Sequence, residues 1–375
     1  MEKILFIISG IFILYLAAES YNAARYRRAI KNVIYVNGTR GKSSVTRLID
    51  AGLRAGGYRT YAKTTGTLPM VIDTNGNEKL IHRRGRANIK EQINILKEAA
   101  KEKSEVLVIE CMAVHPELQY ISQHRMVKSN IGVITNVRPD HLDVMGNTLK
   151  EIGQSLCNTI PKNGTSFTAD QDFFIDFKSR SEKIGAKPYL ILPKGDEPEF
   201  DFSENIALAL AVCEHLGVKR EVALKGMKNY KRDPYALSIY ILSNGAIFIG
   251  GLSINDPVST QLVYERMIKK LDLENHNLTL FISNRLDRGY RTLQHRDLAE
   301  KLDPQAIWIT GGNSRVIARF LSKRLSKCPV TIFKNTMDAP LQDLNANDVV
   351  FAIGNIAEGG NTIMERVKKE GTPYV

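Results

Sequence analysis

The chain opens with an almost wholly apolar run and then alternates between short apolar segments and amphipathic ones. The opening run covers residues 4–18 and carries no charged side chain. It is too apolar for a surface helix, and with its flanks it reaches about the 17 residues that a bilayer span requires. A basic cluster follows, formed by Arg25, Arg27, Arg28 and Lys31. Since positive charge stays on the cytoplasmic side, the pattern predicts a membrane helix with a cytoplasmic body.

A cleaved signal peptide is the alternative interpretation of the apolar run. Only Glu2 and Lys3 precede the run, and no small-x-small cleavage site is well placed. We therefore expect a single-pass anchor at residues 1–20, a basic juxtamembrane linker at 21–32, and a location at the cell membrane.

Beyond residue 32, strand-like and helix-like segments alternate, which is typical of a mostly parallel sheet covered by helices. Strands are predicted at 33–36, 60–63, 106–110 and 130–136, helices at 88–102 and 205–216, and a hairpin at 70–73 and 78–81 around Asn75-Gly76. The alternation restarts after Asp233-Pro234, with strands predicted at 246–249, 278–283, 306–310, 330–333 and 349–353. The sequence thus predicts an α/β fold with two domains.

The first strand runs directly into a glycine-hinged loop and a helix pattern. Gly38 and Gly41 let backbone N–H groups approach phosphate oxygens, Lys42 can reach the β- and γ-phosphates of ATP, and the Ser43 hydroxyl can ligate Mg²⁺. The motif is the shorter G-x-x-G-K-S, because Val36 stands where the usual pattern has its first glycine. An ordinary strand–helix turn is the alternative. The pattern favours a P-loop-type domain at 33–234, followed by a smaller Rossmann-like α/β domain at 235–375.

Polar side chains follow the ends of two further predicted strands. Glu110 ends one, and Asn136 ends the other shortly before Asp140 and His141. Open α/β sheets bind ligands at this edge, and a carboxylate and an imidazole beside Ser43 can hold Mg²⁺ against phosphates. Helix caps and local hydrogen-bond pairs are the alternative roles. The hydroxyl-rich loop at 63–67 and the basic stretch at 82–86 allow both a phosphate or carboxylate site and a solvated turn.

Composition narrows the class of protein. The 375 residues suffice for two cores, and the net charge of +12 indicates an anionic environment such as nucleotide, membrane surface, nucleic acid or acidic product. The four cysteines are widely spaced without a C-x-x-C pair, which favours a reducing compartment. We see no interleaving of aromatic and basic residues of the kind that single-strand binders use, so we expect no nucleic acid partner.

The motifs resemble, in order and spacing, those of the Mur ligase and folylpolyglutamate synthase superfamily of ATP-dependent amide ligases. The resemblance sharpens to the ligase subunit of bacterial poly-γ-glutamate synthase, in which an amino-terminal membrane segment also belongs to the pattern. The segments that carry it are N-G-T-R-G-K-S at 37–43, K-T-T-G-T at 63–67, E-C-M-A-V at 110–114, D-H-L-D-V-M-G at 140–146, S-E-N-I-A-L-A at 203–209, N-D-P-V-S-T at 255–260 and G-N-I at 354–356.

This resemblance implies that ATP phosphorylates the terminal carboxylate of a glutamate chain and that an incoming glutamate amine attacks the acyl phosphate. Catalytic roles fall to Lys42, His141, Asp256 and Arg285, the last two from the second domain. Metal ligation falls to Ser43, Glu110 and His141. Nucleotide contacts fall to Gly38, Thr39, Arg40, Gly41, Lys42, Ser43, Ser44 and Asn205, with Asn205 on the adenine. Implied partners are glutamate, the growing polymer, small integral-membrane subunits and further copies of the chain.

Three rival hypotheses stay open at this stage. The segment 283–287 superficially matches a guanine-reading N-K-x-D motif, as in a membrane-associated GTPase, but arginine replaces the lysine. A non-catalytic basic scaffold would explain the charge but not the loop together with Glu110 and Asp140-His141. A related ligase that joins another amino acid to another carboxylate is the nearest alternative.

Overall fold

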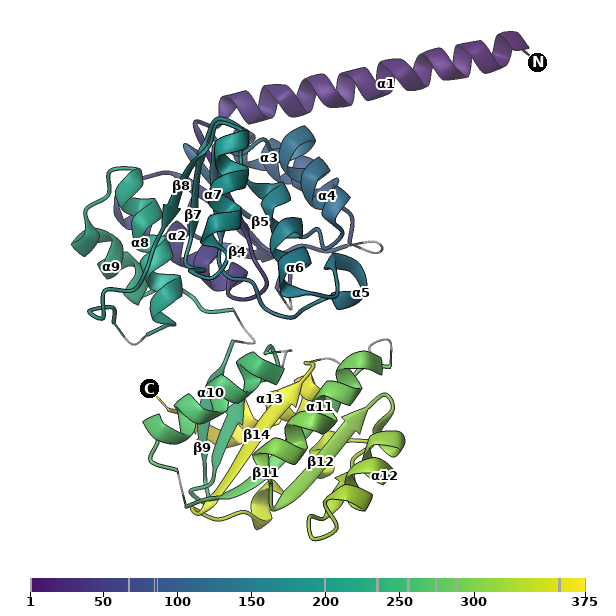
Figure 1. The fold of residues 1–375 in the computed structure, drawn as a ribbon, viewed down its shortest axis with the longest axis vertical. Coiled ribbons are helices and arrows are strands. Elements are labelled where there is room, and N and C mark those ends of the chain that lie inside the picture. The colour runs from purple at the N-terminus through teal and green to yellow at the C-terminus, as the bar shows by residue number, and fades with distance from the viewer. Residues whose placement is uncertain are drawn as a thin grey trace. The chain divides into compact units, whose positions relative to one another are not determined.

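The computed structural model describes residues 2–66, 68–83, 85, 87–198, 200–233, 236–254, 257–273, 275–286, 289–356 and 359–374, without the side chains of residues 2, 5, 258 and 289–292. The chain forms two compact units, Met1–Asp233 and Pro234–Val375. Each unit is a sheet with helices on its faces (Figure 1).

The sheet of the first unit has the strand order β4-β3-β2-β5-β1-β6-β7-β8. Strands β2, β5, β1, β6, β7 and β8 are parallel neighbours, and the hairpin β3–β4 adds antiparallel strands at one edge. The strands are β1 (Asn32–Asn37), β2 (Thr60–Thr64), β3 (Met70–Ile72), β4 (Glu78–Leu80), β5 (Val106–Glu110), β6 (Ile131–Ile134), β7 (Thr165–Thr168) and β8 (Lys187–Leu190).

Alternation along the central strands supplies both faces of this sheet with apolar side chains. On β1, Ile34 and Val36 join the core beneath α2, α8 and α9, whereas Val33 and Tyr35 join the core beneath α3. The helices are α1 (Glu2–Ala29), α2 (Lys42–Ala55), α3 (Glu91–Lys101), α4 (Pro116–Ile121), π-helix η1 (Ser122–Val127), α5 (Leu142–Met145), α6 (Leu149–Leu156), 3₁₀-helix η2 (Cys157–Thr159), α7 (Phe174–Lys183), α8 (Ser203–His215) and α9 (Arg220–Lys228).

Helix α1 leaves the body of the first unit as a single rod (Figure 1). Its amino-terminal part is exposed. Among the described residues, the segment Phe6–Ala29 is long and apolar enough to cross a membrane. Its carboxyl-terminal end packs on the body, where Ala23 is buried and Arg27 Nε donates to the Lys128 carbonyl over 2.8 Å. The helix continues to Ala29, so most of the expected linker at 21–32 is helical, because packing against α3 and η1 extends it.

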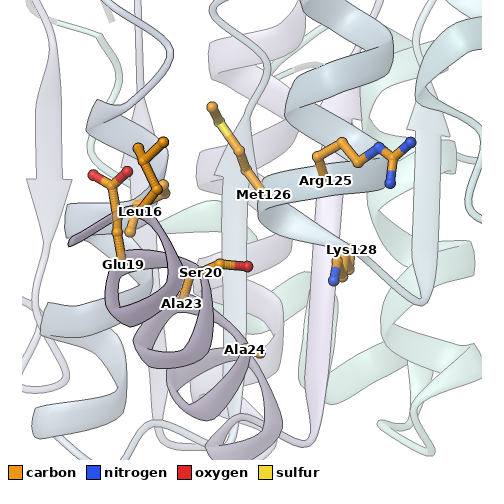
Figure 2. Close-up of a pocket in the computed structure, with 9 residues that line it drawn as sticks. Leu16, Glu19, Ser20, Ala23, Ala24, Arg125, Met126 and Lys128 are labelled. Carbon is orange, nitrogen blue, oxygen red and sulfur yellow. The ribbon is translucent and has the colours of Figure 1, made fainter. Parts of the chain in front are cut away.

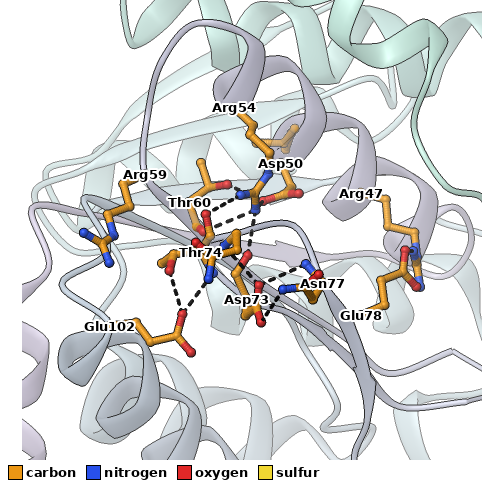
Figure 3. A network of polar contacts seen from close by, with 12 residues as sticks. Arg47, Asp50, Arg54, Arg59, Thr60, Asp73, Thr74, Asn77, Glu78 and Glu102 are labelled. Atoms are coloured by element: carbon orange, nitrogen blue, oxygen red, sulfur yellow. Dashed lines mark hydrogen bonds and ion pairs between the residues drawn. The ribbon is translucent and has the colours of Figure 1, made fainter.

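A polar network ties α2 to the hairpin and to the end of α3 (Figure 3). Arg54 pairs with Asp50 at 3.0 Å and donates to the Thr74 and Asp73 carbonyls. Arg47, almost fully buried, donates to Glu78 on β4 over 2.8 Å. Because burying a guanidinium is favourable only with such partners, the network fixes α2 against the sheet edge.

The second unit has the strand order β13-β12-β11-β14-β10-β9-β15. The first five strands in this order are parallel neighbours, and β9 and β15 are antiparallel. Strands are β9 (Ser238–Leu242), β10 (Ile247–Gly250), β11 (Asn277–Asn284), β12 (Ala306–Gly311), β13 (Val330–Ile332), β14 (Asp348–Gly354) and β15 (Gly371–Pro373). Helices are α10 (Pro257–Lys270), α11 (Gly289–Leu302), α12 (Ser314–Arg324), 3₁₀-helices η3 (Thr336–Asp338) and η4 (Leu341–Asp343), and α13 (Gly360–Glu370).

The elements predicted from the sequence are present with small shifts at their ends. Helix α3 begins at Glu91 instead of residue 88, and α8 begins at Ser203, two residues before the predicted start. The predicted hairpin is present, with Gly76 at a φ of 84° in its turn. The fold is the mixed α/β arrangement that we expected, with two sheets in two units.

Candidate active site

The loop between β1 and α2 lies at the carboxyl edge of the first sheet. Gly38 has a φ of 132° and Gly41, the residue that caps α2, has a φ of 80°. Both values favour glycine, since a β-carbon is disfavoured there. At Gly38 a β-carbon would also lie 2.0 Å from the Thr135 hydroxyl. The strand, the tight loop and the helix start thus bring backbone N–H groups to one place.

Lys42 folds back over its own loop. Its Nζ donates to the Gly38 carbonyl over 2.8 Å and to the Thr39 carbonyl over 3.2 Å. The ammonium group is therefore fixed beside the loop, where a phosphate bound to the N–H groups would meet a positive charge.

The other side of the loop is held by the residues that follow β6. Asn136 Oδ1 accepts from the Thr39 hydroxyl over 2.8 Å and from the Arg40 backbone N–H over 3.1 Å. The Thr135 hydroxyl donates to the Arg40 carbonyl over 2.5 Å. These side chains fix the loop from a neighbouring strand, a role that the sequence analysis did not assign to them. Their position directly after a buried strand was the available signal.

Ser43 and Glu110 meet beside the loop. The Ser43 hydroxyl donates to Glu110 Oε2 over 2.8 Å, and the Thr65 backbone N–H donates to the same oxygen over 2.6 Å. Glu110 is only 2% exposed. A β-carbon on Gly66 would lie 2.9 Å from the Ser43 hydroxyl oxygen, so the loop after β2 closes around this pair. Thr67 lies outside the described residues.

This pair suits a divalent cation of the Mg²⁺ type. Mg²⁺ is commonly held by one or two carboxylates together with phosphate oxygens and water, and it also accepts a hydroxyl ligand. Glu110 and Ser43 provide the carboxylate and the hydroxyl at hydrogen-bond distance from each other. Within the described residues, no group of three or more His, Cys, Asp or Glu side chains forms a protein-only metal cage. The donor set therefore fits an ion shared with phosphates.

Asn205 lies against the same loop from helix α8. A β-carbon on Gly41 would come within 2.6 Å of Asn205 Oδ1. The amide is held by Asp201, whose Oδ1 accepts from Nδ2 over 2.8 Å. The structure thus brings Asn205 to the predicted nucleotide loop from a distant part of the sequence.

Asp140 and His141 follow β6 and lie near the loop through Arg40. Arg40 Nη2 is 3.3 Å from Asp140 Oδ2, and His141 Nε2 is 3.8 Å from the same oxygen. His141 has a φ of 47°, a left-handed conformation that is strained for a residue with a β-carbon. Such strain is concentrated at functional sites, and His141 stands directly before α5.

A buried ion-pair chain extends this edge of the sheet beyond the loop. Lys63, fully buried at the end of β2, lies 3.0 Å from Glu91, which also accepts from Arg83 over 2.7 Å. Burial lowers the pKa of Lys63, and Glu91 opposes that effect. Burial alone would raise the pKa of Glu91, but its bonds with Arg83 and Lys63 outweigh this and lower it. Arg83 therefore has a structural partner, while Arg84 and Arg86 lie outside the described residues.

Two predicted catalytic residues belong to the second unit. Arg285 directly follows the carboxyl end of β11. Asp256 and its neighbour Asn255 lie outside the described residues. The structure thus brings Lys42, Ser43, Glu110 and Asn205 to one loop and places His141 beside Asp140. The catalytic and binding roles of all these residues, and of Asp256 and Arg285, stay predictions.

The loop with Lys42, the serine–glutamate pair beside it and a second α/β unit after it form the arrangement expected of an ATP-dependent amide ligase of the Mur type, and the comparisons with known proteins show that class. The Mur ligase middle domain model matches residues 36–207. The model of the poly-gamma-glutamate synthase CapB C-terminal domain matches residues 238–370.

The chain belongs to the CapB family of poly-γ-glutamate synthases. It is 33% identical to the capsule biosynthesis protein CapB of Bacillus anthracis, covering 90% of this chain and 76% of that protein. It is 32% identical to the PGA synthase CapB of Bacillus subtilis, covering 91% of this chain and 93% of that protein. The enzyme class inferred from the motifs, an ATP-dependent amide ligase, is confirmed.

Solved structures show the same fold at low sequence identity. A bifunctional folylpolyglutamate synthase/dihydrofolate synthase from Yersinia pestis, crystallised with AMPPNP and a manganese ion, matches with a TM-score of 0.69, 15% identity and 92% coverage of both chains. FolC of E. coli in complex with ADP matches with a TM-score of 0.68, 16% identity and 94% coverage of both chains. The shared fold covers both units of this chain.

Proposed function

We propose that this chain polymerises glutamate through γ-linked amide bonds by way of an acyl phosphate. The observation that carries the proposal is the arrangement of Lys42, Ser43 and Glu110 around the loop at the edge of the first sheet. Membership of the CapB family supports glutamate as the substrate, and the nucleotide-bound folylpolyglutamate synthases support ATP.

The chemistry has two steps. The γ-phosphoryl group of ATP moves to a carboxylate oxygen of the acceptor chain, which forms the acyl phosphate and releases ADP. The amine nitrogen of the incoming glutamate then attacks the carbonyl carbon, the bond to the phosphate oxygen breaks, and phosphate and a proton leave. An amide remains.

The residues of the first unit take specific parts in these steps. The loop N–H groups between Gly38 and Ser44 bind phosphate oxygens, and Lys42 follows the charge of the transferred group. Ser43 and Glu110 would hold a Mg²⁺ ion, with His141 near a second one. When bound, such an ion neutralises charge that develops on the phosphate oxygens. Asn205 positions the adenine.

The second unit supplies the remaining groups in this proposal. Asp256 and Arg285 act on the acceptor or on the incoming glutamate, and water has to be excluded from the acyl phosphate. A guanidinium suits carboxylate-bearing substrates because it binds them with two parallel hydrogen bonds. Small integral-membrane subunits and further copies of this chain are proposed as partners.

Helix α1 is proposed to anchor the enzyme as a single-pass segment with the body in the cytoplasm. Its exposed apolar part and the basic residues after it support this topology. A polymer made at the membrane surface is then made close to the place where it is exported.

The test is synthesis with defined substrates. Membranes that contain the full chain receive ATP, Mg²⁺ and one amino acid at a time, and phosphate release and polymer are measured. We expect glutamate alone to support both. Phosphate release with another amino acid in place of glutamate would favour the alternative ligase, and equal activity with GTP would contradict the proposed nucleotide.

A further inference from the structure

A cavity lies where α1 meets the body of the first unit (Figure 2). One wall is the helix face formed by Leu16, Glu19, Ser20, Ala23 and Ala24. The opposite wall consists of Ile93 on α3 and of Arg125, Met126 and Lys128 at the end of the π-helix η1. The cavity measures about 140 Å³. Since one water needs roughly 10–15 Å³ of such space, a group of several heavy atoms such as a phosphate fits.

The cavity carries an excess of positive charge. Arg125 and Lys128 line it with exposed head groups, for which the described part of the chain provides no hydrogen bond or ion pair. The acidic lining residue, Glu19, is already paired with Lys90 at 3.3 Å. Two cationic residues without an acidic partner among the described residues therefore line the cavity, beside the apolar side chains of Leu16 and Met126.

The cavity lies where the uncharged run of α1 ends. The uncharged run ends at Ala18, and the lining reaches Ala24, about 9 Å further along the helix at 1.5 Å per residue. The polar layer on each side of a bilayer is roughly 5–8 Å thick, half the difference between the full thickness and the hydrocarbon core. The α1 wall of the cavity, from Leu16 to Ala24, thus crosses the level of the lipid headgroups if residues 4–18 form the span.

We propose that this cavity is a binding site for an anionic phospholipid, whose phosphate contacts Arg125 and Lys128 and whose glycerol end lies against Leu16 and Met126. The inference rests on the membrane anchor proposed above. It adds a specific site to the general attraction of anionic lipid for the basic residues that follow the span.

The secondary structure of the cavity wall opposite α1 supports a specific binding site. Arg125 and Met126 belong to a π-helix, a rare element that is frequent at functional sites. Its buried side is fixed, because the Ser122 hydroxyl lies 2.6 Å from the Tyr35 hydroxyl on β1. Lys128 ends the π-helix in a left-handed conformation at a φ of 48°. Arg125 and Lys128 both lie on the wall opposite α1, and the exposed Arg125 extends its guanidinium away from that helix in Figure 2.

The experiment measures lipid retention by the full chain. Protein purified in a mild detergent is mixed with phosphatidylglycerol or phosphatidylcholine, and bound lipids are counted by native mass spectrometry. We expect at least tenfold greater retention of phosphatidylglycerol. The double variant R125E/K128E should lower it to the phosphatidylcholine level, while Arg25, Arg28 and Lys31 stay in place.

The matched control makes the same two charge reversals on helix α9, away from the cavity. Lys225 and Lys228 are exposed on α9 with the same three-residue spacing. The variant K225E/K228E should keep the preference for phosphatidylglycerol. Equal losses in both double variants, or an unchanged preference in R125E/K128E, would overturn the proposal. Complete displacement of the lipid by equimolar glycerol 1-phosphate would also overturn it, because a free anion would then be the ligand.

Parallel measurements separate this inference from the proposed function. Release of the protein from membranes by alkaline carbonate would refute the anchor itself. If the unsubstituted protein releases no phosphate in the presence of glutamate, the proposed activity is refuted. Selective loss of lipid retention in R125E/K128E, with both other readouts unchanged, is the result that supports the site.

Discussion

Both sheets end their central parallel strands at one edge, but the two edges are built differently. In the first unit, polar side chains from neighbouring strands, such as Asn136 and Glu110, hold a loop whose N–H groups and lysine lie together. In the second unit, the strand ends pack backbone against backbone. A β-carbon on Gly311 would lie 2.1 Å from the Asn284 carbonyl oxygen, and one on Gly354 would lie 2.2 Å from that of Ser283.

The difference indicates that the two sheet edges have different functions. The first edge has its charged groups fixed in advance and suits phosphate chemistry. The second edge is a tight platform, stabilised by the buried contact between Asn284 and His295 at 3.0 Å, from which the following loop carries Arg285. On this view, nucleotide binding belongs to the first edge alone.

The largest effect is expected for Lys42→Ala. The variant loses the ammonium group that the loop holds beside the proposed phosphate site, so glutamate-dependent phosphate release should fall by about 10²–10³-fold. Steady-state assays measure this, with circular dichroism to show an intact fold. Near-normal turnover would place the chemistry away from this edge. Lys225→Ala on α9 serves as the control for loss of a lysine.

Arg285→Ala should separate binding from chemistry. ATP binding to the first unit should remain, while amide formation falls by roughly 10²-fold, as when one preorganised donor is lost. Isothermal titration gives the affinity and polymer assays give the rate. Asp256→Ala should behave in the same way. Parent-like polymer synthesis by both variants would remove the second edge from the reaction.

Glu110→Gln keeps an acceptor for Ser43 and Thr65 but removes the negative charge. The Mg²⁺ concentration for half-maximal activity should rise by about 10–100-fold, which is typical when a metal site loses a supporting interaction. A magnesium titration of phosphate release checks this. An unchanged midpoint would show that the ion is held elsewhere.

Gly41→Ala and Gly57→Ala form a matched pair at similar left-handed φ values of 80° and 88°. Both variants should lose stability by about 1–2 kcal/mol, because alanine is disfavoured there. Only Gly41→Ala meets Asn205, since nothing lies within 4 Å of a β-carbon at Gly57. We expect ATP affinity to fall about tenfold, equal to about 1.4 kcal/mol, in Gly41→Ala alone. Equal affinities would remove Asn205 from the nucleotide site.

The smallest effect concerns Glu91, whose lowered pKa has a defined sign. Its stabilising contribution is fully present above its ordinary pKa of 4.5 and is lost as pH falls through the lower folded value. The difference in melting temperature between the parent and Glu91→Gln should thus shrink below pH 4.5, by a few degrees. Thermal scans across the acid range measure it, with Glu182→Gln, at an exposed position, as the control. A pH-independent difference would contradict the ion-pair account.

The sequence allowed the site of the first unit to be predicted where a motif and a periodic pattern coincide. The loop, Lys42, Ser43 and Glu110 follow strong apolar runs, so their place at a strand end could be inferred. The holding role of Asn136 and the ion pair between Lys63 and Glu91 depend on which strands are neighbours, and no local pattern carries that information.

Strand β7 and the edge strand β8 are not predicted from the sequence. Strand β8, Lys187–Leu190, alternates between exposed and half-buried positions and has only four residues, and β7 is rich in Ser and Thr. Such segments lack the apolar run by which a buried strand is recognised, because tertiary pairing determines them. The helical continuation of α1 to Ala29 likewise comes from packing on the body, since its basic residues are compatible with both a helix and a linker.

The fold-back of Lys42 has an entropic consequence for ligand affinity. A lysine that becomes ordered only when it meets a phosphate loses rotamer freedom worth about 1.5–2 kcal/mol. Lys42 Nζ already donates to the carbonyls of Gly38 and Thr39 over 2.8 and 3.2 Å. The side-chain entropy of Lys42 is therefore lost when the loop folds and not when a phosphate binds. Binding of a phosphate then exchanges one set of acceptors for another around a cation that is already in place, and most of the electrostatic attraction remains available as affinity.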